Sequence, residues 1–284
     1  MTDRLGRADL HIHTLASDGT SGIIEILDYA EKATDLDVIA ITDHERIDAA
    51  LAARTIARER GMRVEVVVGE EISTLGGHLL ALFVEERIRP LRSLRVSIAE
   101  IHEQGGLAIP AHPLVPYPLC AQGWVLRRLI EDRDPRVRPD AIEAFNPTTL
   151  GRPWHGRVVR FAAEHGLPTV GNSDAHEAAA IGTGWSSYPG KSANDLRAAI
   201  VEGRSRHHGS FHAAGGQLAT FGRQLRKYSR DARATVRGHV RRDGSGRDLG
   251  YPGGSQRPPR FEEAWATLRD ARARDIVEGS DRSR

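Results

Sequence analysis

The stretch ADLHIHTLASDGT, residues 8–20, decides how the rest of the sequence is interpreted, because it places two histidines on alternate positions behind a short apolar lead-in. Side chains two positions apart on an extended segment point to the same face, so His11 and His13 can reach one point in space. A strand that leads into a loop would bring Asp18 to the same rim. This arrangement indicates a metal site, although two histidines at this spacing also occur in cores and on surfaces.

Up to about His208, short apolar runs alternate with longer amphipathic segments. The runs that predict strands are ADLHI, DVIAIT, VEVVVG, HLLALF, GLAIPA, AIEAF and LPTVG. The segments that predict helices are 23–34, 48–60, 94–104 and 156–165. Strands that alternate with helices predict an α/β fold with a mostly parallel sheet covered on both faces. About seven such units fit a closed barrel better than a small open sheet, although periodicity alone leaves a doubly wound fold open.

Imidazoles and carboxylates gather where the predicted strands end. In chain order they are Asp43, His44, Glu70, Glu71, His112, Asp174 and His176, with His78 opening the strand after the two glutamates. The active sites of barrels and open α/β sheets form at the carboxyl ends of their strands. The sequence therefore predicts that these side chains meet at one rim of the sheet.

Five motifs carry a family resemblance. DLHIHTLASDG, AITDH, GEEIS followed by His78, AIPAHP and GNSDAH resemble, in this order, the five motifs of the PHP (polymerase and histidinol phosphatase) superfamily. The resemblance covers about the first 180 residues. It implies a distorted (β/α)7, TIM-like barrel that holds two or three divalent metals, and a hydrolase that acts on phosphoesters.

The resemblance also implies nine metal ligands. One metal is expected among His11, His13, Glu71 and Asp174, a second between Glu71, His78 and His112, and a third between Asp18, His44 and His176. The family motif Gly-x-Glu places the bridging ligand at Glu71 rather than Glu70, and because adjacent strand residues face opposite ways, only one of the two can be that ligand. Asp43 is expected to orient a ligand histidine from behind. The catalytic candidates are Glu71, Asp174 and His112, and the residues that bind the substrate are not assigned.

The ligand types themselves indicate the chemistry. Histidine and carboxylate ligands without thiolate favour Mn, Fe or Zn in a catalytic site. Neighbouring metals can lower the pKa of a shared water and clamp a phosphate for in-line attack. We therefore predict a metal-dependent phosphoesterase that acts on a small phosphomonoester or nucleotide-type substrate, with a cluster-bound hydroxide as the nucleophile.

The composition of the chain excludes several other classes of protein. A chain of 284 residues, 39% hydrophobic and 27% charged, can form one large α/β domain with a tail. The single cysteine, Cys120, excludes an internal disulfide framework and a cysteine-rich zinc site. No apolar run reaches the roughly 18 residues of a membrane span. No apolar signal core precedes His11, so we predict a cytoplasmic protein.

The net charge of +2 hides an asymmetry. Residues 1–202 hold 22 basic and 29 acidic side chains, whereas residues 203–250 hold 11 basic and 3 acidic ones. We predict a PHP barrel over residues 1–212 and a basic extension over residues 213–284. The extension contains a Gly/Pro-rich linker, expected to be disordered, and a closing helical segment that could dock through Phe261, Trp265 and Leu268.

Two alternatives remain open. The substrate could be a nucleic-acid end, as for an exonuclease or end phosphatase, with the Arg-rich extension contacting phosphates. The protein could instead be a non-catalytic scaffold stabilised by its metals.

The segment LASDGT resembles the branch of the superfamily that acts on nucleotide bisphosphates and short RNA 5′ ends. However, the 33 residues between His78 and His112 leave no room for the helical insertion frequent in that branch. No oligomeric state is assigned.

Overall fold

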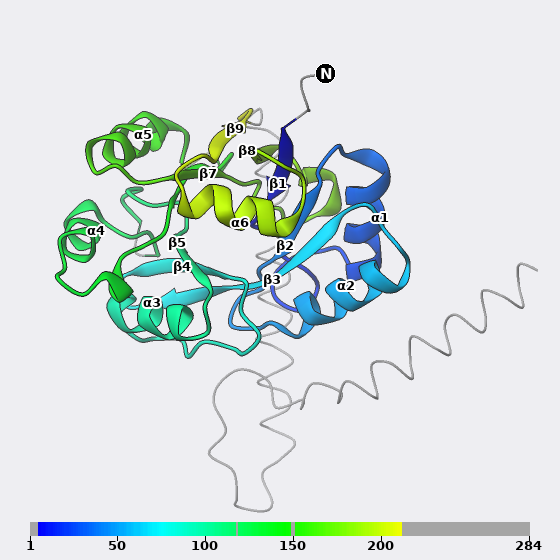
Figure 1. Ribbon diagram of the computed structural model, residues 1–284, viewed down its shortest axis with the longest axis horizontal. Coiled ribbons are helices and arrows are strands. Elements are labelled where there is room, and N and C mark those ends of the chain that lie inside the picture. The colour runs from blue at the N-terminus through cyan, green and yellow to red at the C-terminus, as the bar shows by residue number, and fades with distance from the viewer. Residues whose placement is uncertain (1–4, 118, 149–150, 212–284) are drawn as a thin grey trace, which may run out of the picture. The chain divides into compact units, whose positions relative to one another are not determined.

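The computed structural model describes residues 5–117, 119–148 and 151–211, in which helices lie around the outside of a curled layer of strands (Figure 1). The strands are β1 (Gly6–Asp9), β2 (Val38–Ile41), β3 (Glu65–Thr74), β4 (Gly77–Leu82), β5 (Leu107–Pro110), β6 (Ile142–Phe145), β7 (Thr169–Gly171), β8 (Gly184–Tyr188) and β9 (Arg206–Gly209). The predicted extension over residues 213–284 lies outside the described residues.

The α-helices have lengths between 8 and 12 residues. They are α1 (Ile23–Ala33), α2 (Asp48–Glu59), α3 (Leu94–Glu103), α4 (Gly123–Ile130), α5 (His155–Glu164) and α6 (Ala193–Val201). Three short 3-10 helices are η1 (Pro135–Val137), η2 (Arg152–Trp154) and η3 (Ala178–Ala180). The four predicted helices form with ends within one residue of those expected, and every predicted apolar run overlaps a strand. None of the helices described is long and apolar enough to cross a membrane.

The larger sheet has the strand order β5-β4-β3-β2-β1-β8-β9. Its pairs β1 with β2 and β2 with β3 are parallel, but β3 with β4, β4 with β5, β1 with β8 and β8 with β9 are antiparallel. The α/β class is confirmed, whereas the prediction of a mostly parallel sheet is wrong. The physical reason is the tight connection between β3 and β4, because a two-residue turn can join only antiparallel strands. The count of seven β/α units stays a prediction.

A second, two-stranded sheet of β6 and β7 lies between the edges of the larger one. Just before β6, the backbone N–H of Asp140 donates to the carbonyl of Ala108 in β5 (3.0 Å). On the other side, the N–H of Gly171 in β7 donates to Ser186 Oγ in β8 (2.9 Å). The strands therefore curl round, and the segments that follow them are brought towards a common rim.

Apolar side chains of the strands and helices hold this arrangement together. Helix α2 shows the pattern: Ala49, Ala53, Ile56 and Ala57 recur at helical spacing and are buried in the core. The strands β2 and β5 are buried along their whole length. Most polar side chains of the site lie beyond the strand ends, whereas Glu71, His78 and Glu143 lie within strands.

Candidate metal centre

A short parallel bridge between Ile12 and Ala175, beyond the ends of β1 and β7, builds the first part of the site. The N–H of His13 donates to the Ala175 carbonyl (2.8 Å), and the N–H of Ala175 donates to the His11 carbonyl (3.1 Å). Ile12 and Ala175 pack into the apolar core. Because side chains alternate along extended chain, their neighbours project to the opposite face: His11, His13, Asp174 and His176.

The hairpin of β3 and β4 adds Glu71 and His78. Ser73 pairs with His78 in the antiparallel register, and Glu71 lies two residues before Ser73. Glu71 and His78 therefore project from the same face of the hairpin. Glu70 projects from the other face, where its carboxylate accepts the backbone N–H of Ile88 (2.5 Å) and burial raises its pKa to about 7. The hairpin thus places Glu71, and not Glu70, among the histidines.

Four atoms converge in the first group of ligand-type side chains. His11 Nε2 lies 3.2 Å from Glu71 Oε2 and 3.4 Å from Asp174 Oδ1. His13 Nε2 lies 3.3 Å from each of the same two oxygens. Ligands bound tetrahedrally at about 2.1 Å from a metal are about 3.4 Å apart. These four distances match that spacing, and His11, His13 and Asp174 form a group that could hold one cation.

The other oxygen of Glu71 belongs to a second group. Glu71 Oε1 lies 2.7 Å from His78 Nδ1 and 3.1 Å from His112 Nε2. His112 is held from behind by Cys120, whose Sγ lies 3.3 Å from Nδ1 of the same ring. A single carboxylate thus faces two groups of imidazoles, one through each oxygen.

Asp18 forms a third group with His13 and His176, whereas His44, which was expected there, groups with His13 and Glu71. Asp18 Oδ2 lies 3.0 Å from His176 Nε2 and 3.7 Å from His44 Nε2. His44 reaches back to the first group through Nδ1, which lies 3.4 Å from Glu71 Oε2. The structure therefore brings together all nine side chains that the sequence proposed as ligands.

Several buried nitrogen atoms of the cluster make no well-directed hydrogen bond within the described ranges, although carboxylate oxygens lie close to them. These atoms are His11 Nε2, both ring nitrogens of His13, and His78 Nδ1. A buried polar atom without a partner costs on the order of 1–3 kcal/mol. Cations held between these nitrogens and the carboxylates would remove that cost, so the residues fit a cluster of divalent metals.

The electrostatics of the cluster keep its carboxylates ionised. Burial opposes the ionisation of Glu71, but His78, His11 and His44 together hold its pKa well below its usual range. Burial lowers the pKa of His13, but Asp18, Asp174 and Glu71 outweigh it and raise that pKa to about 10. Protons and cations therefore compete for the same imidazole nitrogens, as expected for a metal site.

Glu143 belongs to the site and was not predicted. Its Oε1 lies 3.0 Å from His11 Nδ1 and accepts from Asn172 Nδ2 (2.8 Å). Its Oε2 accepts the backbone N–H of His112 (2.6 Å) and Asn146 Nδ2 (3.0 Å). A fully buried carboxylate that fixes the outer nitrogen of an imidazole sets which nitrogen faces a metal. The signal in the sequence was a charged residue within the apolar run AIEAF.

The contacts of Asp43 differ from the role predicted for it. Its carboxylate accepts the N–H and the hydroxyl of Thr14 (both 2.7 Å) and the hydroxyl of Ser17. No bond from Asp43 to a histidine occurs in the part of the chain that the structure describes, because these three donors occupy its oxygens. Asp43 therefore holds the loop that carries Asp18, rather than orienting a ligand histidine.

The cluster is open on one side. The side chains of His11 and His13 are fully buried, whereas those of His44 and His112 are 23% and 17% exposed. A substrate would therefore approach past His44 and His112. Arg46, near this opening, is already engaged by Asp48 and by the carbonyl of Ala16.

Known proteins are similar to this chain in sequence or in fold. Residues 152–205 match the PHP-associated family. The chain is 36% identical over 151 residues to the uncharacterized protein MJ1587 of Methanocaldococcus jannaschii, a match that covers 49% of this chain and 81% of that protein.

Two solved structures have the same fold. One is a two-domain protein of Bacteroides vulgatus that contains a predicted PHP-like metal-dependent phosphoesterase. It superposes with a TM-score of 0.59 at 17% identity and covers 78% of this chain and 70% of that one. The other is a predicted metal-dependent phosphoesterase of Bifidobacterium adolescentis, with a TM-score of 0.52 at 16% identity, covering 74% of this chain and 98% of that one.

Replacement of Glu143 tests how the cluster is supported. We expect Glu143→Gln to weaken manganese binding about 10- to 100-fold, because the amide cannot hold His11 as the carboxylate does. Competition with a chelating dye measures the affinity. Glu70→Gln is the matched control, since Glu70 is also buried but bonds away from the cluster. Equal affinities in the two variants would contradict the assigned role of Glu143.

Proposed function

The chain belongs to the PHP superfamily, and from this premise we propose that it is a metal-dependent phosphoesterase that acts on a small phosphomonoester or nucleotide-type substrate. The observation that carries the proposal is the carboxylate of Glu71, whose two oxygens face separate groups of histidines. The descriptions of the similar Bacteroides and Bifidobacterium proteins as metal-dependent phosphoesterases support it.

The proposed metals are held by the nine side chains described above. When bound, two or three divalent cations would lower the pKa of a shared water, so that hydroxide becomes available as the nucleophile, and would neutralise the phosphate charge. Mn, Fe and Zn suit ligands of this type. Glu71, Asp174 and His112 contribute by holding fixed ligand atoms at the centre of the cluster. No serine or cysteine nucleophile is needed.

The surrounding residues fix these atoms before a substrate arrives. Glu143 holds His11 and the backbone of His112, and Asp43 holds the loop of Asp18. A preorganised site of this kind needs little rearrangement as charge develops on the phosphate oxygens. The more exposed His44 and His112 form the side from which we propose that the phosphate enters.

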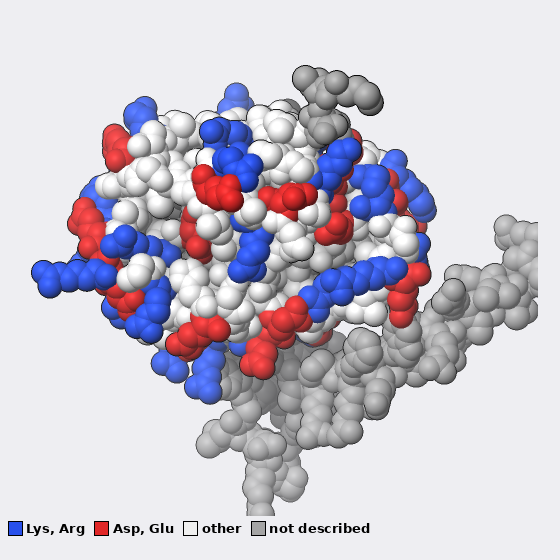
Figure 2. Space-filling model, in the orientation of Figure 1, with Lys and Arg blue, Asp and Glu red and all other residues white. Residues whose placement is uncertain are grey.

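A small substrate is preferred over a nucleic-acid end. The Arg-rich segment expected to contact a nucleic acid lies outside the described residues. On the face shown in Figure 2, basic and acidic side chains are intermingled rather than gathered into one basic surface. A long polyanion would be favoured by a continuous basic surface.

Turnover tests the proposed activity. The manganese-loaded chain should hydrolyse members of a panel of phosphorylated metabolites, nucleotides and short 5′-phosphorylated RNAs, with release of inorganic phosphate. EDTA should abolish the activity, and added manganese should restore it. Absence of turnover on every member, in protein shown to contain its metals, would overturn the proposal and favour a scaffold.

Glu71 and Glu70 provide a matched pair of adjacent glutamates. We expect Glu71→Gln to lower kcat at least about 100-fold, roughly 2.7 kcal/mol in barrier height, because the substitution removes negative charge from two groups of ligands at once. Glu70→Gln should retain kcat within about tenfold. Phosphate release by both variants, with metal content measured alongside, provides the comparison. Equal rates at unchanged metal content would contradict the bridging role of Glu71.

A further inference from the structure

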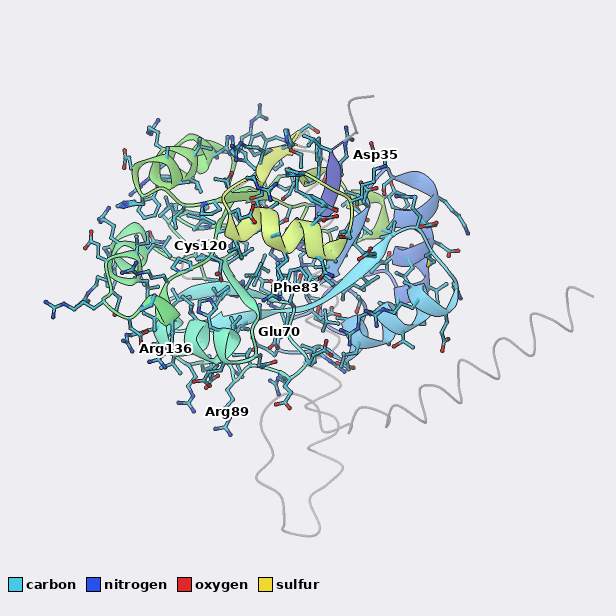
Figure 3. The ribbon with its side chains drawn as sticks, viewed as in Figure 1. Asp35, Glu70, Phe83, Arg89, Cys120 and Arg136 are labelled. Atoms are coloured by element: carbon cyan, nitrogen blue, oxygen red, sulfur yellow. The ribbon has the colours of Figure 1, made fainter. Side chains whose placement is uncertain are left out.

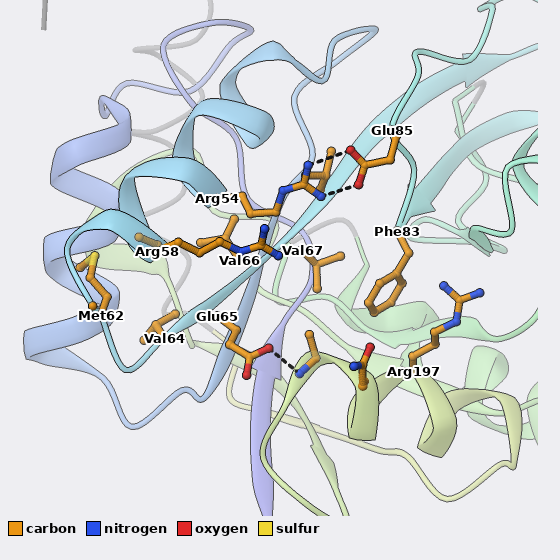
Figure 4. A pocket seen from close by; sticks show the side chains of 15 residues that line it. Arg54, Arg58, Met62, Val64, Glu65, Val66, Val67, Phe83, Glu85 and Arg197 are labelled. Carbon is orange, nitrogen blue, oxygen red and sulfur yellow. Dashed lines mark hydrogen bonds and ion pairs between the residues drawn. The ribbon is translucent and has the colours of Figure 1, made fainter. Parts of the chain in front are cut away.

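A cavity of about 580 Å³ lies beside the start of β3, between α2 and α6 (Figure 4). Val66 and Val67, near the start of β3, line it, whereas Glu71 lies further along the same strand. Five residues of strand span about 16 Å. The cavity is therefore separate from the metal centre and faces the opposite end of the strand.

Three arginines and two glutamates line the cavity. Arg54 and Arg58 lie one turn apart on α2 and so share a face of that helix, while Arg197 comes from α6. Both carboxylates have partners: Glu85 binds Arg54 through two hydrogen bonds, and Glu65 accepts the backbone N–H of Ala193 (3.0 Å). The lining therefore carries one more positive charge than negative.

Arg58 supplies a positive charge that no hydrogen bond in the described part of the chain holds, although this charge also helps to lower the pKa of Glu85. Its guanidinium makes no hydrogen bond or close ion pair with any residue in the described ranges. Arg54 is held by Glu85, and Arg197 donates to the carbonyl of Gly105. The hydrogen bonds from Arg54 lower the pKa of Glu85, which therefore stays ionised near neutral pH. An anion that enters the cavity could bind Arg58 directly. To bind Arg54, it would have to displace the carboxylate of Glu85.

Phe83 gives the cavity an aromatic wall. The residue follows β4 directly, and the guanidinium carbon of Arg197 lies 5.1 Å from its ring centre. Its backbone has a φ of 60°, a left-handed conformation that costs a side-chain-bearing residue about 1–2 kcal/mol. The N–H of Phe83 is tied to the carbonyl of Val68 (2.8 Å). Figure 3 shows Phe83 well inside the outline of the body, unlike Arg89 and Arg136, which reach outward.

These features are complementary to one class of ligand. Strained backbone that the surroundings maintain is concentrated at ligand sites. An aromatic ring can stack on Phe83, and the neighbouring valines exclude water from its edge. A guanidinium without a partner binds phosphate by charge-assisted hydrogen bonds. The volume lies within the range of about 300–1,000 Å³ of small-molecule sites.

We propose that this cavity binds a small organic phosphate with a planar ring, of the size of a mononucleotide. The ring packs against Phe83 and Val67, and the phosphate binds Arg58. This site is independent of the proposed catalytic function, because among the described residues no hydrogen bond or ion pair joins its lining to the nine ligand-type side chains.

A phosphonate analogue of AMP, which cannot be hydrolysed, tests the proposal on the full-length, manganese-loaded chain. Calorimetry should show two binding events: one at the metal centre, which EDTA abolishes, and one that persists in EDTA and that Arg58→Ala weakens about tenfold, as expected for loss of one charge-assisted bond. Arg60→Ala is the control, since Arg60 lies just past the end of α2 and pairs with Asp28. It should leave affinity within about twofold. Glu85→Gln should tighten binding, because it releases Arg54.

The contact between the ring of the ligand and Phe83 is tested with a separate variant. Phe83→Leu should weaken binding of the analogue but leave binding of inorganic phosphate unchanged. Circular dichroism checks that the variants fold. Affinities that are the same in the Arg58→Ala, Glu85→Gln and unaltered proteins would overturn the proposal, as would failure of the analogue to bind at millimolar concentration. An equal effect of Phe83→Leu on both ligands would overturn the assignment of a ring-binding wall.

Discussion

The ionised carboxylate of Glu71, buried among five histidines, is the constraint on which the rest of the site depends. An isolated carboxylate at this depth would cost several kcal/mol, and it is tolerated only with charge partners in good geometry. Those partners come from segments far apart in the chain. Chain segments beyond the ends of β1, β2, β5 and β7 must therefore meet at one rim.

The combination of parallel and antiparallel strand pairs brings these segments together. The antiparallel hairpin places His78 on the same face as Glu71, within 2.7 Å of its carboxylate. The parallel bridge of Ile12 with Ala175 puts the flanking residues on one face, and their apolar partners anchor the segment in the core. Two ligand-type residues, His112 and Asp174, also have left-handed backbone. Such strain persists where the surrounding structure determines the conformation, and here Glu143 and Asn146 supply that support.

Local patterns in the sequence predicted much of the fold and the composition of the site. Residues such as His11 and Asp174 could be identified because each follows an apolar strand pattern with strong periodicity. The choice of Glu71 over Glu70 followed from the resemblance of GEEIS to the family motif, since alternation along a strand shows only that one of the two can face the site. The helices at 23–34 and 48–60 were similarly clear, because their apolar spacing is regular.

What escaped prediction depended on contacts between distant segments. Glu143 lies in the middle of a strand, and its importance follows only from the approach of His11, 132 residues away in the chain. Asp43 was assigned to a histidine because a histidine is its neighbour, but Thr14 and Ser17 reach it first. Strands β8 and β9 carry the polar runs GWSSY and RHHG, which lack the apolar signal of the other strands. The cavity beside Phe83 combines residues of α2, β3 and α6, and no single motif marks it.

The central claim is that Glu71 holds divalent metals through both of its oxygens. Anomalous diffraction at the manganese edge, from crystals of the manganese-loaded protein, tests this claim most directly. We predict a peak at about 2.0–2.2 Å from each oxygen of Glu71, the usual range for carboxylate ligands of such metals. One peak should lie beside His11 and His13, and the other beside His78 and His112. A map with no peak within reach of Glu71, in protein that binds manganese in solution, would contradict the account.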